Sequence, residues 1–185
     1  MRDACGVSRL VQQLIALLAA LRQNGIRHAA IGGLAVVAHG VVRATQDLDF
    51  LIDAADAARL HAAMTQLGLR SIHASPDALN YASAELRVDF LLARRRPTLE
   101  LLASAGVRQA FGHALPVVDV EGLVGLKLQA LVNDPRRQQD LVDIRALLAA
   151  HRKSIDVERL RGYFRLFERE AMLDDLLREA EREAD

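Results

Sequence analysis

The chain has 185 residues, of which 51% are hydrophobic and only 4% are aromatic, with no tryptophan. This length suits one well-buried domain with a helical appendage and excludes two large domains. Its 24 basic and 24 acidic residues balance, so no global positive field draws the protein to nucleic acid or anionic lipid, and any such contact must come from a local patch.

The beginning of the chain predicts an amphipathic helix that ends near Asn24-Gly25, because leucines recur at helical spacing. Polar Gln12 and Gln13 interrupt this stretch, which argues against a signal peptide, and no run approaches the ~20 apolar residues of a membrane span. The single cysteine, Cys5, cannot form an internal disulfide, and its place near the terminus argues against a catalytic thiol. We expect an unexported, cytoplasmic protein. The leucines are Leu10, Leu14, Leu17, Leu18 and Leu21.

Strand and helix signals alternate in the next hundred residues. A short apolar segment enters the glycine pair Gly32-Gly33, and a later segment alternates carboxylates with apolar side chains, as a strand does. Asp53 is placed to cap the helix that follows it. The expected elements are strands at 26–31, 47–52, 69–73, 80–83, 86–92 and 115–120, and helices at 34–39, 54–67 and 97–105, with a weak segment at 107–111.

Beyond Glu121 the sequence predicts only helices, with breaks near Asp134-Pro135, 151–155 and 163–167. The fold class is therefore α+β, with a small mixed β-sheet flanked by helices. We expect a core with its N-terminal helix at 1–120 and a C-terminal helical region packed on it at 121–185.

Three carboxylates suggest a metal site. In Asp47-Leu48-Asp49 the period of a strand puts both carboxylates on one face, about 7 Å apart along the chain. Hard cations such as Mg²⁺ take carboxylate oxygens and keep positions for water and phosphates. Asp89 lies on another apolar strand and meets the first two if the strands are neighbours. The alternative is that Asp47 and Asp49 are surface acids, or acids paired with Arg43.

The glycine pair adds backbone N–H groups for phosphate. Three carboxylates and a glycine turn are the parts needed to hold two metal ions against a triphosphate. One ion lowers the pKa of an attacking hydroxyl, and the other steadies the leaving pyrophosphate.

The segment from Ile31-Gly32-Gly33 to Asp47-Leu48-Asp49-Phe50 resembles the signature of the nucleotidyltransferase superfamily, which has a polymerase-β-like fold. It looks closest to the AbiEii-type branch, known from type IV toxin–antitoxin and abortive-infection systems. The resemblance covers residues 26 to about 148. It implies a transferase that moves a nucleoside monophosphate from a nucleoside triphosphate, with Mg²⁺ or Mn²⁺, to a hydroxyl of an RNA such as tRNA or of a partner toxin or antitoxin protein.

Residue by residue, the resemblance makes Gly32 and Gly33 the phosphate turn, Asp47 and Asp49 the metal-binding pair, and Asp89 the third carboxylate. Asp89 would help to activate the acceptor hydroxyl. Many members of the superfamily place serine where Gly33 stands, so this chain offers only backbone donors there. A rival interpretation is a catalytically degenerate fold that neutralises a partner protein by binding it.

Four further residues are candidates for nucleotide binding: Arg43, Thr45, Lys127 and Asp140. Arg43 and Thr45 could contact the triphosphate, or they could form a structural ion pair and cap a turn. Lys127 stands in an apolar helical stretch of a chain that otherwise uses arginine, so its compact ammonium could reach a phosphate, or it could snorkel at the edge of the core.

The AbiEii-type pattern also has a helix lysine at this point, followed by an arginine and an acidic pair, which match Arg137, Asp140 and Asp143. It therefore favours Lys127 and includes Asp140. The two acids could instead pair with neighbouring arginines. Arg94-Arg95-Arg96 is the best local basic patch, either for an acceptor with phosphates or as a solvated loop.

Overall fold

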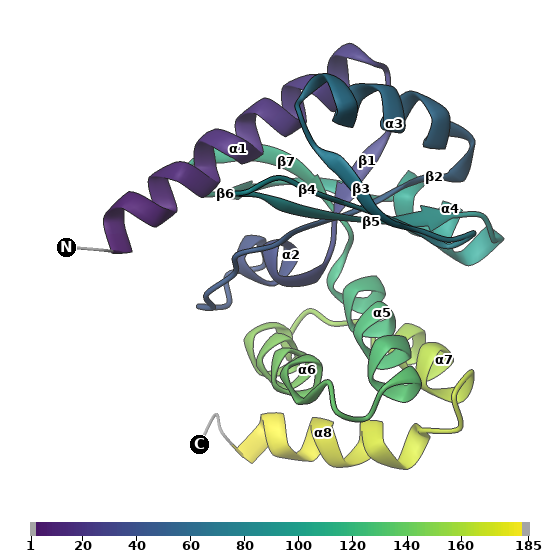
Figure 1. Ribbon diagram of the computed structural model, residues 1–185. Coiled ribbons are helices and arrows are strands. Elements are labelled where there is room, and N and C mark those ends of the chain that lie inside the picture. Colours follow the sequence, from purple (N-terminus) through teal and green to yellow (C-terminus); the bar gives the residue numbers. More distant parts are fainter. Residues whose placement is uncertain (1–2, 183–185) are drawn as a thin grey trace. The chain divides into compact units, whose positions relative to one another are not determined.

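The computed structural model describes residues 3–182, without the side chains of residues 3–8, so the thiol of Cys5 lies outside the described residues. The chain forms two compact units (Figure 1). We call Met1–Ala35 with Ala44–Val118 the sheet unit, and Val36–Arg43 with Asp119–Asp185 the helical unit. The sequence places the boundary at residue 120 and gives no sign that the short segment Val36–Arg43 belongs with the helices.

The sheet unit contains a seven-stranded mixed sheet in the order β3-β4-β5-β2-β1-β7-β6. The pairs β2–β5 and β1–β7 are parallel, and the other neighbours are antiparallel. This confirms the expected fold class. The strands are β1 (His28–Ala30), β2 (Leu48–Asp53), β3 (Arg70–Ala74), β4 (Ala78–Ala82), β5 (Arg87–Ala93), β6 (Gly106–Ala110) and β7 (His113–Val117).

One face of the sheet carries its aromatic core. Phe50 stacks on Phe90 with ring centroids 6.1 Å apart, and Phe90 meets Tyr81 edge-on at 6.0 Å. The Tyr81 hydroxyl lies 3.2 Å from His61 Nδ1 on helix α3 (Ala57–Gln66), so α3 covers this face. Helix α1 (Asp3–Gln23) lies beside α3 on the same side (Figure 1). Since strand residues alternate between faces, residues such as Asp49 and Asp89 are on the opposite face.

Local signals set most element boundaries. Asp53 caps a short 3-10 turn (Ala54–Asp56) before α3, because its side chain accepts from the Ala55 N–H at 2.9 Å, as the sequence predicts. Helix α4 (Arg96–Ala103) begins at the last residue of the arginine run and contacts β2 and β5. The weak segment at 107–111 is in fact an edge strand, β6. Its side chains are largely exposed, so it has no alternating apolar face to reveal it.

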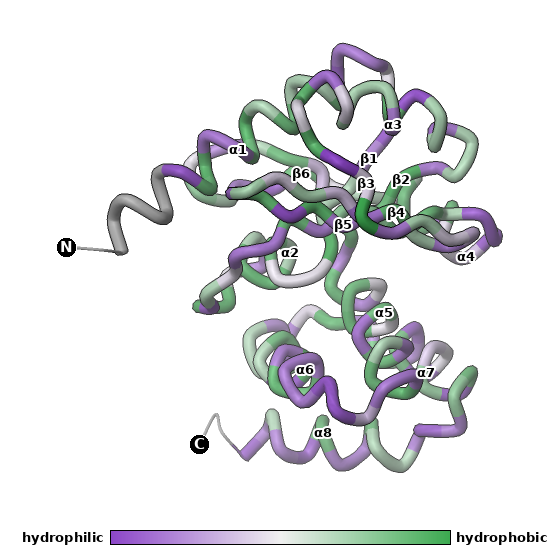
Figure 2. Tube along the Cα trace, viewed as in Figure 1, coloured by the Kyte–Doolittle hydropathy of each residue, from purple (hydrophilic) through white to green (hydrophobic). Residues whose placement is uncertain are grey.

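The helical unit contains four helices and the last part of α2 (Gly32–Ala38). Tyr163 packs on Gly125, where an added Cβ would lie 3.0 Å from the ring, so α5 and α7 approach closely. Along α8, hydrophobic and hydrophilic residues alternate in short runs (Figure 2), and its buried residues are at helical spacing. No helix among the described residues is long and apolar enough to cross a membrane. The helices are α5 (Val120–Asn133), α6 (Gln138–His151), α7 (Val157–Arg165) and α8 (Glu170–Arg182).

Candidate active site

The glycine turn between β1 and α2 is built against Asp49. Gly32 has a φ of +57°, and a Cβ at this position would lie 2.5 Å from Asp49 Cγ and nearer still to Oδ2. The neighbouring Ile31 N–H donates to the Asp49 carbonyl at 3.0 Å. Both the positive φ and the missing side chain are therefore required of Gly32, and they bring the backbone of the turn next to a carboxylate.

Asp49 and Asp89 stand side by side in the sheet. The parallel pair β2–β5 puts them directly in register, and the antiparallel pair β4–β5 puts Asn80 opposite Asp89. Partners in register share a sheet face, and neighbouring strands are about 4.8 Å apart. Of the three carboxylates that the sequence is expected to bring together, Asp49 and Asp89 thus lie side by side on adjacent strands, and Asn80 extends the row.

Asp89 is held by its neighbours. The Asn80 side-chain amide donates to Asp89 Oδ1 at 2.6 Å, and Arg87 Nε lies 3.4 Å from the same oxygen. The Asp89 side chain is 27% exposed. The amide and the guanidinium orient the carboxylate, and a group that is both oriented and accessible suits ligand binding.

Asp47 stands one residue before β2 and is exposed. The Thr45 hydroxyl donates to the Asp47 carbonyl at 3.2 Å, so Thr45 stabilises the turn that leads into the strand. Among the described residues, no group of three or more His, Cys, Asp or Glu side chains is arranged to hold a metal ion. The assignment of Asp47 as a third ligand stays a prediction.

The donor set nonetheless fits magnesium. Mg²⁺ is usually bound by one or two carboxylates, with water and substrate phosphates completing its octahedral shell. Asp49 and Asp89 supply that pair, and Gly32, which has no side chain, lets the backbone of the turn lie directly against the Asp49 carboxylate.

The helical unit holds a different set of predicted residues in a buried ion cluster. Lys127 is 4% exposed, and its ammonium donates to Asp140 Oδ1 at 2.9 Å and to Asp143 Oδ2 at 2.6 Å. Arg137 Nε donates to Asp140 at 2.6 Å, and Arg43 Nη1 donates to Asp143 at 2.7 Å. Three cations thus surround two carboxylates. Burial favours the neutral form of Asp140, but the hydrogen bonds from Lys127 and Arg137 outweigh it and keep the pKa of Asp140 below its usual value.

Lys127 does not snorkel, because its ammonium is buried in ion pairs. Moving it to a phosphate would take a compensating charge from two buried carboxylates, which is costly. Its contact with phosphate therefore stays a prediction, as do those of Arg43 and Asp140. Arg43 forms the structural ion pair that the sequence allows, but its partner is Asp143 and not Asp47 or Asp49.

Asn80 and Arg87 are the functional candidates that the sequence did not reveal. Asn80 lies on a strand without any motif of its own, and its contact with Asp89 depends on the register of β4 against β5. Arg87 is two residues before Asp89, so strand periodicity alone could have placed both on one face.

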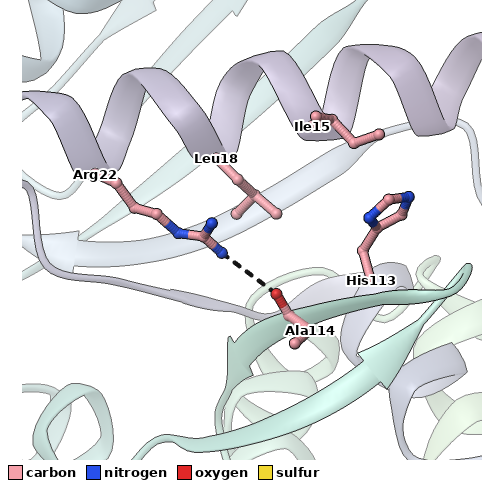
Figure 3. A pocket seen from close by; sticks show the side chains of 5 residues that line it. All are labelled: Ile15, Leu18, Arg22, His113 and Ala114. Atoms are coloured by element: carbon pink, nitrogen blue, oxygen red, sulfur yellow. Dashed lines mark hydrogen bonds between the residues drawn. The ribbon is translucent and has the colours of Figure 1, made fainter.

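In the basic patch Arg94-Arg95-Arg96, two of the arginines have local partners. Arg94 Nε donates to the Pro76 carbonyl, and Arg96 pairs with Glu100 at 2.7 Å while 90% exposed. A pocket of about 240 Å³ lies elsewhere in the sheet unit, between α1 and β7. Figure 3 shows that Arg22 closes one end of it by donating to the Ala114 carbonyl at 3.3 Å. No predicted site residue lines this pocket.

Comparison with solved structures shows the fold. The antibiotic-resistance factor ANT(2'')-Ia matches over 94% of this chain and 97% of its own, with 18% identity and a TM-score of 0.66. The lincosamide antibiotic adenylyltransferase LnuA matches over 74% of this chain and 94% of its own, with 13% identity and a TM-score of 0.54. An antigenic nucleotidyltransferase-like protein from Paracoccidioides brasiliensis matches over 89% and 91%, with 15% identity and a TM-score of 0.53. No protein-family model and no curated protein matches the chain.

Proposed function

We propose that this chain is a nucleotidyltransferase that moves a nucleoside monophosphate from a nucleoside triphosphate to an acceptor hydroxyl with the help of Mg²⁺. The observation that carries the proposal is the pair Asp49 and Asp89, in register on parallel strands beside a turn in which Gly32 abuts Asp49. The chain has the fold of nucleotidyltransferases, and the resemblance of residues 31–50 to their signature supports the same activity.

Each residue has a role in this reaction. Gly32 and Gly33 offer backbone donors to the triphosphate, and Asp47, Asp49 and Asp89 hold the metal. When bound, Mg²⁺ supplies positive charge that polarises the phosphate and lowers the pKa of a nearby hydroxyl. The acceptor oxygen bonds to the α-phosphorus, the bond to pyrophosphate breaks, and Asp89 takes the hydroxyl proton. Asn80 and Arg87 keep Asp89 Oδ1 in place during this transfer.

The acceptor and the biological setting follow from the resemblance. It points to a cytoplasmic enzyme of a type IV toxin–antitoxin or abortive-infection system, with tRNA or a partner toxin or antitoxin protein as acceptor. Two of the similar structures contain antibiotic compounds, adenylyl-2''-tobramycin in ANT(2'')-Ia and lincomycin in LnuA. Small antibiotics therefore join the acceptors worth testing.

A labelling experiment tests the proposal. The protein is incubated with Mg²⁺ and each of the four nucleoside triphosphates, labelled at the α-phosphate, together with total RNA, nuclease-treated cell lysate, or tobramycin and lincomycin. Label should move to one acceptor class and require the metal. Label in no acceptor would overturn the proposal and favour a non-catalytic binding module.

Three variants make the result specific. Asp49→Asn and Asp89→Asn should both abolish labelling, since each removes a ligand charge. Asp53→Asn is the matched control, because Asp53 lies on the same strand and face as Asp49, is 30% exposed, and caps a turn that asparagine also caps.

A further inference from the structure

The sheet face that bears Asp49 and Asp89 also bears arginines. Arg70 on β3 is in register with Ala82 on β4, and Ala82 is in register with Arg87 on β5. The three residues therefore form a row across the sheet, next to the row of Asp49, Asp89 and Asn80. Two strand spacings, about 10 Å, separate the backbones of the two arginines, and only a methyl group stands between them.

Arg87 keeps donors available beyond its contact with Asp89. That contact is loose, at 3.4 Å, and uses Nε, whereas a guanidinium carries four further N–H donors. The Arg87 side chain is 55% exposed. Arg87 is therefore an accessible cation two residues from Asp89, the carboxylate to which the proposed function brings the acceptor hydroxyl.

Arg70 adds a second cation without a local counter-ion. Every residue of β3 is exposed, and Arg70 makes no ion pair with any side chain that the structure describes. Two guanidiniums on one face with a small residue between them suit one anionic group or two successive ones.

We propose that Arg87 and Arg70 form a phosphate subsite for the acceptor, so that the enzyme selects a phosphate-bearing acceptor, an RNA, over a cationic small molecule. This proposal rests on the proposed function, in which Asp89 takes the proton of the acceptor hydroxyl. The arginine row attracts the RNA backbone and repels amine-bearing acceptors such as tobramycin, so Arg87 and Arg70 determine specificity without touching the reacting atoms.

Binding of a fluorescein-labelled single-stranded RNA, followed by anisotropy over a series of salt concentrations, tests the subsite without catalysis. Arg87→Ala and Arg70→Ala should each weaken binding, on the order of tenfold at low salt, and lower the slope of log K against log[salt] by about 0.7, the share of one phosphate contact. Arg87→Lys should keep most of the slope, since the charge remains.

Arg27→Ala is the matched control. Arg27 is 57% exposed and pairs loosely with an aspartate, Asp53, at 3.7 Å, much as Arg87 does with Asp89, but it stands next to β1, away from the arginine row. It should bind RNA like the parent. Equal binding by Arg87→Ala, Arg70→Ala and Arg27→Ala, or no binding by the parent, would overturn the subsite.

The labelling experiment separates this proposal from the proposed function. Transfer to RNA that falls in Arg70→Ala, at a residue with no part in holding Asp89, but not in Arg27→Ala supports both. Transfer by the parent to tobramycin or to a lysate protein, and not to RNA, keeps the nucleotidyltransferase and overturns the phosphate subsite. RNA binding that depends on both arginines, without transfer to any acceptor, would show an RNA-binding surface at the arginine row but would overturn the proposed function and, with it, the role of this row in acceptor choice.

Discussion

Two pairs of aspartates, one in each unit, differ in how their charges are balanced. Asp140 and Asp143 are buried and meet Lys127, Arg43 and Arg137 at 2.6 to 2.9 Å. Asp49 and Asp89 lie side by side on neighbouring strands, where Asp89 is accessible and has one loose cation. Residue type is therefore a poor guide to role. Asp140 and Asp143 have their charges compensated inside the protein, whereas an accessible carboxylate with one loose cation, such as Asp89, is suited to bind a metal ion.

The largest effect is expected for Lys127→Ala. It leaves two buried carboxylates with less compensating charge, and breaking a buried ion pair costs about 3–5 kcal/mol. Urea denaturation should show this loss. Lys153→Ala, which removes the only other lysine and one that is exposed, should leave the stability within ~0.5 kcal/mol of the parent. A Lys127→Ala protein as stable as the parent would show that the buried carboxylates do not need Lys127, whose ammonium could then bind a ligand.

Gly32→Ala tests the packing of the turn on Asp49. An added Cβ collides with the Asp49 carboxylate, and the residue must also adopt a φ of +57°. We expect a loss of about 1–3 kcal/mol and a loss of nucleotide binding. Gly68→Ala is the control, because Gly68 also has a positive φ but nothing lies within 4 Å of its added Cβ. If both variants lose the same stability and bind nucleotide alike, the close approach to Asp49 has no function.

Metal binding should also distinguish the two pairs of aspartates. Mg²⁺ or Mn²⁺ that binds the folded state should raise the melting temperature of the parent. At a concentration about 100 times its dissociation constant the ion adds about 2.7 kcal/mol. Asp89→Asn should lose the rise, whereas Asp134→Asn, at an exposed acid of the helical unit, should keep it. Equal rises in both variants would place the metal elsewhere.

The smallest expected effect is a difference between the two units in how their stability changes as the pH falls. Burial lowers the pKa of His28 below its usual 6.5, although its hydrogen bond with the Ile26 carbonyl opposes the shift. The unfolded chain then takes up the proton first, so stability present above about pH 6.5 is lost as the pH falls below it. The pKa of Asp140 is also lowered, from 3.8, so its contribution is kept down to about pH 4 and lost only below.

Amide hydrogen exchange, followed separately in the two units between pH 7.5 and 5, checks the order in which they lose stability. The sheet unit should lose protection first, and His28→Asn, which keeps a donor for Ile26, should lessen the loss. Earlier loss in the helical unit would contradict the assigned causes.

The sequence predicted those features that depend on local signals. The glycine turn, the alternation around Asp49, the cap at Asp53 and the parity of Asp89 all follow from short-range rules, and the structure has them. It could not predict that Arg43 pairs with Asp143, a hundred residues away, or that Asn80 meets Asp89. Those contacts depend on how distant segments and strands assemble. The edge strand β6 could not be predicted as a strand, because its side chains are largely exposed and show no alternating apolar pattern.

Calorimetric titration with a non-hydrolysable nucleoside triphosphate, with and without Mg²⁺, tests the central claim most directly. We predict that the parent binds the nucleotide in a metal-dependent manner, and that Asp49→Asn and Asp89→Asn each weaken this binding by more than about 100-fold, because even outer partners of metal ligands are worth 10–100-fold. Asp53→Asn should match the parent. Metal-dependent binding that survives in both Asp49→Asn and Asp89→Asn would show that the in-register pair is not the metal site.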